Sequence, residues 1–161
     1  MTVGFILNGE DVVVQAGADR RLLDILRDTF KLFGSKASCR VGRCGSCSVI
    51  LNGKLVPSCL IPAFSVRGGE VITIEGFMQT DEYLDIAAGF ARSGVEMCGF
   101  CESAKILATE ALLDKSPRPT REEILSAFDG VLCRCTDPRT LAEGVAAASD
   151  ARQRRLYGRA P

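Results

Sequence analysis

The eight cysteines of this 161-residue sequence are its most chemically informative residues, and they fall into two groups of four. The first cysteine set is Cys39, Cys44, Cys47 and Cys59, and the second cysteine set is Cys98, Cys101, Cys133 and Cys135. Thiols are kept reduced in the cytosol, so cysteines grouped in this way favour metal ligation or redox chemistry over disulfides. The sequence contains no histidine, which excludes histidine-based catalysis and mixed Cys/His zinc sites. We therefore expect two centres ligated by cysteine alone.

The first cysteine set has the spacing C-x4-C-x2-C, followed after eleven residues by its fourth cysteine. This is the pattern by which plant-type ferredoxins hold a [2Fe–2S] cluster. Zinc sites usually combine two C-x2–4-C pairs, and these spacings do not divide in that way. Gly42 and Gly45 lie between the cysteines, and glycine adopts the positive φ angles that a loop wrapped around a cluster requires. We expect a [2Fe–2S] cluster bound by the four cysteines and approached closely by the two glycines.

Two arginines, Arg40 and Arg43, lie inside the first cysteine set. A cluster ligated by four thiolates and two sulfides is anionic and becomes more so on reduction. A nearby cation therefore favours the reduced form and raises the reduction potential. The alternative is that both side chains point into water or contact carboxylates of a partner. The sequence alone leaves these two interpretations open.

The second cysteine set consists of a C-x2-C pair and a C-x-C pair separated by 31 residues. This spacing is compatible with an iron–sulfur cluster and with a four-cysteine zinc site, although a C-x-C pair is less usual for zinc. Cys101 begins one predicted helix and Cys135 lies just ahead of another. The positive ends of both helix dipoles then point at the site, where they stabilise an anionic centre. Spacing by itself leaves the metal open.

The overall composition does not indicate a nucleic acid or a membrane as a partner. Twenty basic and twenty acidic residues leave no net charge, so bulk electrostatics favour neither. The sequence has no secretory signal pattern at its start and no run of about 18 apolar residues, the length of a membrane span. We expect a cytoplasmic protein without a membrane span.

The elements that must position the first cysteine set are a small mixed sheet and one helix laid across it. The pair Asn8 and Gly9 lies between two β-branched segments and predicts a β-hairpin. A helix is expected to begin with Asp19 as its N-cap and to end by Gly34, because apolar residues recur between them at helical spacing. These apolar residues are Leu22, Leu23, Leu26 and Phe30. Residues 47–51, 54–58 and 70–76 are expected to be strands.

The second half of the chain is rich in alanine and leucine, and it predicts four helices over residues 82–93, 100–115, 121–128 and 138–152. Thr120 with Glu123 forms a capping-box pattern, and Asp137 before Pro138 is typical of an N-cap followed by proline in the first turn. The predicted domains are residues 1–76 and residues 82–152, followed by a basic tail over residues 153–161. The arginines after Asp150 are expected to lie in solvent, with a docking segment as the alternative: Arg152, Arg154, Arg155 and Arg159.

With both cysteine sets in this order, the sequence resembles the small iron–sulfur subunit of the molybdenum hydroxylases, the xanthine dehydrogenase and aldehyde oxidoreductase family. The resemblance covers about residues 3–150 and is carried by the segments LLDILRD, CRVGRCGSCSVILNGKLVPSCL, ITIEG, GVEMCGFC and GVLCRCT. It implies an α+β protein in which an N-terminal β-grasp plant-type ferredoxin domain is followed by a C-terminal four-helix-bundle domain. It also implies one [2Fe–2S] cluster in each domain, which favours iron over zinc at the second cysteine set.

The resemblance further implies an electron-transfer function. Substrate is hydroxylated at a molybdenum–pterin centre in a large partner subunit, and single electrons pass through two clusters to FAD in a flavin subunit or to another acceptor. Cys98, Cys101, Cys133 and Cys135 are implied as ligands of the cluster nearest molybdenum, and Cys39, Cys44, Cys47 and Cys59 as ligands of the cluster nearer the flavin. The resemblance implies no catalytic acid, base or nucleophile in this chain, because the substrate site belongs to the partner.

Several residues near the second cysteine set depart from the family pattern. Met97 stands where the family commonly has a glutamine able to hydrogen-bond the pterin, and methionine accepts only weakly and does not donate. Residues 102–104 and 137–138 also differ from the usual family residues. All eight cysteines are retained, so we expect both clusters and an altered pterin environment. Two alternatives remain: a free-standing carrier with two clusters, and a one-cluster ferredoxin with a zinc-stabilised interaction module.

Overall fold

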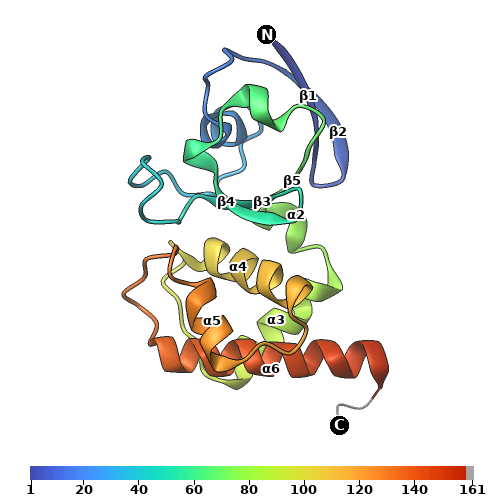
Figure 1. The fold of residues 1–161 in the computed structure, drawn as a ribbon, viewed down its shortest axis with the longest axis vertical. Helices are drawn as coiled ribbons and strands as arrows, with labels where there is room; N and C mark the ends of the chain where they lie inside the picture. The colour runs from blue at the N-terminus through green and yellow to red at the C-terminus, as the bar shows by residue number, and fades with distance from the viewer. Residues whose placement is uncertain (159–161) are drawn as a thin grey trace.

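Two parts are stacked along the long axis of the molecule (Figure 1). The structure is a computed structural model, and it describes residues 1–158. A sheet with short helices forms the first part, at the top of the view, and helices form the second part below it. The N-terminus and the end of the last helix lie at opposite ends of the molecule. Within residues 1–158, no helix is long and apolar enough to cross a membrane.

The first part contains, among the described residues, a five-stranded mixed sheet with the strand order β2-β1-β5-β3-β4. The strands are β1 (Thr2–Leu7), β2 (Glu10–Gln15), β3 (Ser48–Leu51), β4 (Lys54–Pro57) and β5 (Glu70–Ile72). β1 and β5 pair in parallel, and the other neighbours pair antiparallel. The predicted hairpin is confirmed, and Asn8 and Gly9 at its turn both have the positive φ angles that a tight two-residue turn requires.

The helix of the first part is shorter and less regular than the sequence predicts. α1 spans only Leu22–Asp24 and continues as a π-helical turn over Ile25–Thr29. Its N-cap is Arg21, so the prediction that Asp19 caps this helix was wrong. The physical reason is tertiary, because the carbonyl of Ile61 accepts the first helical N–H at 2.7 Å in place of a side-chain cap. Leu22, Ile25 and Leu26 are buried in one cluster with apolar residues of β1 and β2, whereas Leu23 packs with Cys47 and Cys59.

The segment after β4 also departs from the prediction. Two 3-10 turns, η2 (Ser58–Leu60) and η3 (Ala63–Val66), lead to β5. The strand predicted over residues 70–76 ends at Ile72, and α2 (Ile74–Phe77) follows it. The side-chain oxygen of Asn8 accepts the Thr73 N–H at 2.8 Å, and this side-chain contact occupies the backbone donor with which the strand would continue.

Within the described residues, four helices form the second part: α3 (Asp81–Arg92), α4 (Glu102–Lys115), α5 (Arg121–Ala127) and α6 (Pro138–Tyr157). The four predicted helices are confirmed, with ends displaced by one or two residues except at the end of α6. The capping box of Thr120 with Glu123 and the Asp137 N-cap are also confirmed. α3 and α6 pack so closely that a Cβ at Gly89 would clash with the backbone of Ala148.

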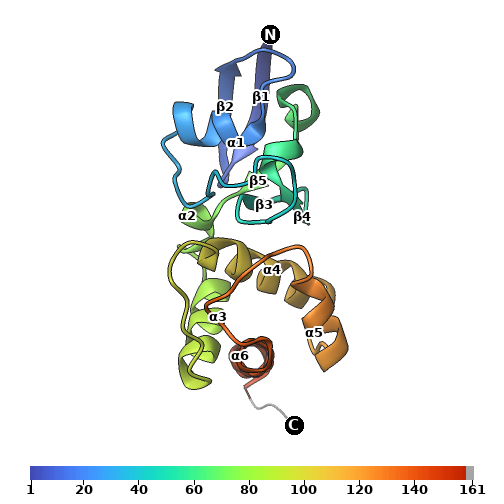
Figure 2. The ribbon, with the colours of Figure 1, turned by 90° about the vertical axis from the view of Figure 1, so that its left-hand side faces the viewer.

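The two parts share an apolar core across their boundary. α4 lies against β3 and β4 (Figure 2). Ile50 of β3 and Phe77 of α2 belong to the same buried cluster as Ile106 and Leu107 of α4. Complete burial of such a side chain contributes about 2 kcal/mol, so hydrophobic burial sets how the parts dock. The docking in turn sets where the two cysteine sets lie relative to one another.

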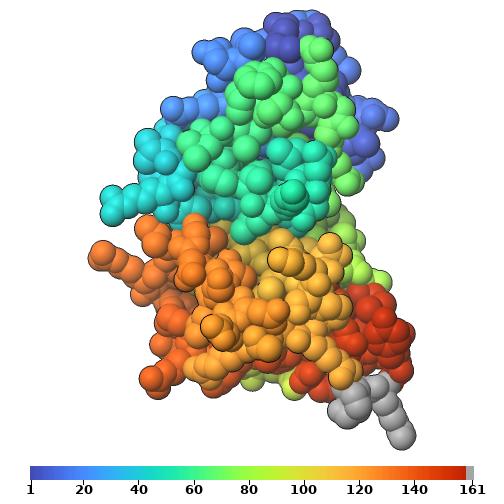
Figure 3. Space-filling model, in the orientation of Figure 1, coloured from blue at the N-terminus to red at the C-terminus, as the bar shows by residue number. Residues whose placement is uncertain are grey.

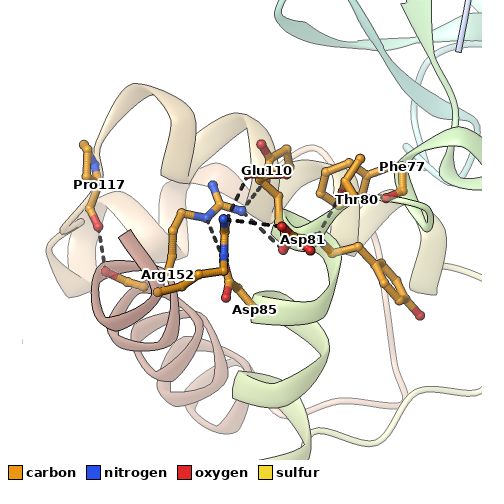
Figure 4. Close-up of polar contacts among 11 residues, drawn as sticks. Phe77, Thr80, Asp81, Asp85, Glu110, Pro117 and Arg152 are labelled. Carbon is orange, nitrogen blue, oxygen red and sulfur yellow. Dashed lines mark hydrogen bonds and ion pairs between the residues drawn. The ribbon is translucent and has the colours of Figure 1, made fainter. Parts of the chain in front are cut away.

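Helix α6 extends five residues beyond Arg152, where the sequence predicts it to end, and this corrects the expectation of a solvated tail. Arg152 is 6% exposed and its Nη2 lies 2.5 Å from Glu110 Oε2, while its Nε lies 3.7 Å from Asp85 Oδ2 (Figure 4). Arg155 approaches the same Asp85 carboxylate at 2.9 Å. These ion pairs fasten the end of α6 to α3 and α4, whereas Arg154 is exposed. Arg159 and the rest of the predicted tail after residue 158 lie outside the described residues.

We predict that Arg152→Met destabilises the protein, because the buried carboxylate of Asp85 and the partly buried carboxylate of Glu110 then have one cation fewer. Removing one partner of a buried ion pair costs about 3–5 kcal/mol, and we expect a loss near the lower end in the free energy of unfolding measured with urea. Arg154→Met removes an exposed arginine of the same helix and should change that free energy by less than about 0.5 kcal/mol. Equal effects of the two substitutions would show that the buried ion pairs do not stabilise the fold.

Candidate metal centres

The loop that carries the first cysteine set directs backbone N–H groups at its sulfurs. The Sγ of Cys39 accepts from the N–H groups of Arg43 and Cys44, both at 3.3 Å. The Sγ of Cys59 accepts from the N–H of Gly42 at 3.3 Å. Hydrogen bonds to a sulfur favour its thiolate form and stabilise the anionic sulfurs of a metal centre. The loop is therefore arranged around negatively charged sulfur.

Positive φ angles give this loop its shape. Gly42 and Gly45 have φ angles of 73° and 71°, which agrees with the conformation that the sequence predicts. Arg40 also has a positive φ, of 57°, in spite of its side chain. The atoms that would meet an added Cβ belong to the protein: the side chain of Leu60 at Gly42, and the carbonyl group of Gly130 at Gly45. The two glycines therefore permit close packing within the chain as well as the turn of the loop.

The thiols of the first cysteine set lie as two pairs. Cys47 and Cys59 are buried in contact with one another, whereas Cys39 and Cys44 are partly exposed. Burial opposes ionisation of Cys44, but hydrogen bonding by Ser46 and Cys39 outweighs it and lowers the pKa of Cys44 to about 6. Burial and the adjacent Cys47 raise the pKa of Cys59 to about 11. Near pH 7 the metal-free chain therefore keeps the Cys59 thiol protonated, and a metal must displace that proton on binding.

The two arginines of the first cysteine set have different surroundings. Arg40 forms an ion pair with Asp24 of α1, with 2.6 Å between Nη2 and Oδ1. Its partner is thus a carboxylate of the same chain, which neither interpretation of the sequence foresaw. Arg43 is exposed, and no carboxylate of residues 1–158 lies within ion-pair distance of it. Arg43 therefore carries the uncompensated positive charge of this loop.

The second cysteine set is assembled from two loops. The sulfurs of Cys101, Cys133 and Cys135 all lie within 4.8 Å of one another, and those of Cys133 and Cys135 are 3.2 Å apart. The backbone N–H of Cys98 and the thiol of Cys133 both hydrogen-bond to Cys135, and these contacts lower the pKa of Cys135 to about 6. Cys98 therefore lies beside this trio. Burial and the adjacent Cys133 raise the pKa of Cys101 to about 12. The structure thus brings three of the four predicted cysteines together, and Cys98 lies next to Cys135 outside that close group.

Two helix N-termini adjoin the second cysteine set, as the sequence predicts. Cys101 is itself the N-cap of α4, and Asp137 caps α6 two residues after Cys135. The Thr136 hydroxyl donates to the carbonyl of Glu96 at 2.5 Å and ties the two cysteine loops to one another. The dipoles of both long helices therefore favour negative charge at this site.

The loops of the two cysteine sets are in direct contact. The N–H of Leu132, the residue before Cys133, donates to the carbonyl of Cys44 at 2.9 Å. Gly45, the residue after Cys44, lies against the carbonyl group of Gly130, two residues before Leu132. Figure 3 shows the residues near 40 and those near 130 adjoining at the boundary between the two parts. No spacing in the sequence signals this contact, because it arises from the docking of α4 on the sheet.

The donor atoms of both sites fit a centre made of iron and sulfide. Each site offers four cysteine sulfurs, and within the described residues no carboxylate joins the close group of Cys101, Cys133 and Cys135. Backbone N–H groups point at the sulfurs of the first cysteine set, and helix N-termini adjoin the second. Sulfur-only donor sets serve zinc and iron–sulfur centres alike, so donor chemistry leaves this choice open.

Two family models match the chain, one in each part. The model described as "2Fe-2S iron-sulfur cluster binding domain" matches residues 5–70, and the model described as "[2Fe-2S] binding domain" matches residues 73–146. The second match supports iron over zinc at the second cysteine set. Fold, sites and family models together define an iron–sulfur protein with two [2Fe–2S]-binding domains in one small chain.

Relatives and solved structures narrow this class to a family. The chain is 40% identical over 136 residues to the nicotinate dehydrogenase small FeS subunit of Eubacterium barkeri, covering 84% of this chain and 87% of that protein. It is 39% identical over 134 residues to the isoquinoline 1-oxidoreductase subunit alpha of Brevundimonas diminuta, covering 83% and 88%. The structure of quinoline 2-oxidoreductase from Pseudomonas putida 86 matches with a TM-score of 0.85 at 31% identity, covering 95% of this chain and 96% of the matched chain. The chain belongs to the small iron–sulfur subunits of the molybdenum hydroxylase family, which confirms the resemblance seen in the sequence.

We predict that Gly45→Ala disrupts the contact between the two cysteine loops, because the new Cβ clashes with the carbonyl group of Gly130. The positive φ adds about 1 kcal/mol of backbone strain. Gly53→Ala is a matched control, since Gly53 has a φ of 76° but no atom within 4 Å of an added Cβ. We expect Gly45→Ala to lower bound iron per chain and the midpoint of thermal unfolding, and Gly53→Ala to lower only the midpoint, slightly. Indistinguishable variants would mean that the Gly45 contact is not required.

Proposed function

We propose that the chain carries single electrons from a molybdenum–pterin centre in a large partner subunit to FAD in a flavin subunit, or to another acceptor. It is an electron-transfer subunit of the molybdenum hydroxylase family. The main support for the proposal is the hydrogen bond between Leu132 and Cys44, which joins a loop of the first cysteine set to a loop of the second within one small chain. Electron exchange between two centres benefits from such a contact, whereas a structural zinc module has no need of it.

The proposed ligands are the eight cysteines. Cys39, Cys44, Cys47 and Cys59 hold the cluster nearer the flavin, and Cys98, Cys101, Cys133 and Cys135 hold the cluster nearest molybdenum. A [2Fe–2S] cluster supplies one-electron oxidation and reduction at each site. The protein's own contributions are the N–H groups directed at sulfur, the turns at Gly42 and Gly45, and the docking that keeps the sites adjacent. No residue of the chain acts as a catalytic acid, base or nucleophile in this proposal, and the substrate site lies in the partner.

We further propose that residues 1–76 are a β-grasp domain and that α3 to α6 are the four-helix bundle of the family. The mixed sheet with one helical segment packed on it, followed by helices alone, supports this division. Met97, at the usual position of a glutamine, is partly buried and packs against the apolar core. Its side chain therefore provides no amide for the pterin, and we propose that backbone groups of residues 96–99 or groups of the partner replace that contact.

Metal analysis tests the proposal directly. Protein purified without air should hold four irons and four acid-labile sulfides per chain and no zinc, and should co-purify with a molybdenum-containing subunit. Cys47→Ser and Cys101→Ser should each lose about half of the iron, because each removes a ligand from a different cluster. Two irons with one zinc would instead identify a ferredoxin joined to a zinc module, and four irons in a chain without any molybdenum partner would identify a free-standing carrier.

A second prediction concerns the contact between the loops. Leu132→Pro removes the N–H that donates to Cys44, whereas Leu132→Ala keeps it and serves as the control for the lost side chain. We expect electron exchange between the two centres, followed by rapid-freeze EPR after partial reduction, to be slower in the proline variant and unchanged in the alanine variant. Both variants should retain four irons. Equal exchange rates in the two variants would show that this hydrogen bond does not contribute to coupling.

A further inference from the structure

Lys105 is a buried lysine beside the second cysteine set. It lies one helical turn after Cys101 in α4, and only 4% of the residue is exposed. Its ammonium lies 5.3 Å from the centre of the Phe128 ring. The side chain also lines a cavity of about 210 Å³ that Cys133 lines from the opposite loop. The positive charge of Lys105 is thus held against an aromatic ring, at a cavity that one of the cysteines also lines.

The fold supplies no carboxylate to balance this charge. Among residues 1–158, no carboxylate oxygen lies within 4.0 Å of the Lys105 ammonium. Asp129 lines the same cavity, but it is exposed and outside that distance. Contact with one aromatic face compensates only part of the cost of removing an ammonium from water, and buried charges are normally paired. The position of Lys105 is therefore suited to an anion held at the cysteines beside its cavity.

The second cysteine set provides that anion when its thiols are ionised on metal. Four thiolates and two sulfides leave a [2Fe–2S] centre with a net negative charge that increases on reduction. Lys105 lies one helical turn after Cys101 and lines the same cavity as Cys133. Its positive charge is therefore held near two proposed ligands of the site.

We infer that Lys105 is the counter-ion of the second metal centre, and that its ammonium stabilises the reduced state of that centre and so raises its reduction potential. Lys105 is a positioning residue in this role, because it touches no substrate and ligates no metal. The inference rests on the proposed function, since it requires an iron–sulfur cluster at the second cysteine set. It assigns to this chain a means of favouring electron entry at the site nearest its molybdenum partner.

An EPR-monitored redox titration of Lys105→Met tests the inference, because methionine retains most of the volume and removes the charge. We expect the equilibrium constant for reduction of the second centre to fall about tenfold, which is about 59 mV for one electron. The signal of the second centre is the one that Cys101→Ser removes. Lys115→Met, at the exposed end of the same helix, should leave both potentials unchanged, and Lys105→Arg should keep the wild-type value. An unchanged potential in Lys105→Met, with both signals present, would overturn the inference and leave the proposed function intact.

The stability of the metal-free protein gives an independent readout. Without a cluster the buried ammonium is uncompensated, so Lys105→Met should raise the urea midpoint of the metal-free chain, and this gain should vanish once iron is bound. A lysine that merely fills space would lower the midpoint equally in both forms, which contradicts the inference. If Asp129 were the true partner of Lys105, Asp129→Asn would leave the lysine unpaired and lower the urea midpoint of the metal-free chain, and this result also overturns the inference. A wild-type chain without a second iron centre would overturn the proposed function together with the inference.

Discussion

The hydrogen bond from the Leu132 N–H to the Cys44 carbonyl is the contact on which the relation between the two cysteine sets depends. A backbone hydrogen bond between two loops forms only over a narrow range of distances and angles. The apolar cluster that joins β3 to α4 supplies the necessary placement. Gly45 allows the carbonyl of Gly130 to approach without a clash. The apolar burial that stabilises the molecule therefore also determines the distance between the two proposed redox centres.

The two buried cationic residues Arg152 and Lys105 of the helical part differ in whether carboxylates surround them. Arg152 is surrounded by the carboxylates of Asp85 and Glu110, and these ion pairs fix the end of α6. Lys105 has comparable burial but, among residues 1–158, no carboxylate within ion-pair distance. Burying an unpaired charge is costly, and this cost is the basis on which we assign Lys105 as the counter-ion of the second metal centre.

The parts of the fold that follow local rules were predictable from the sequence. The hairpin at Asn8 and Gly9, the capping box of Thr120 and the Asp137 N-cap depend on neighbouring residues, and each was predicted correctly. The two cysteine sets were recognisable because metal-binding loops impose fixed spacings. Features created by long-range packing were not predictable: the carbonyl of Ile61 accepts the first N–H of α1, and Asn8, which follows the neighbouring strand β1, ends β5. The ion pairs that prolong α6 and the burial of Lys105 belong to the same class, because their partners are distant in sequence.

In the proposed arrangement, two iron–sulfur centres lie close together across the contact between Cys44 and Leu132. Low-temperature EPR of the same sample, first with one centre reduced and then with both, measures this directly, because two nearby paramagnets split or broaden each other's signals. We predict sharp signals in the half-reduced protein and magnetically split signals in the fully reduced protein. Two signals that remain unaltered on full reduction, or one signal only, would contradict the arrangement described above.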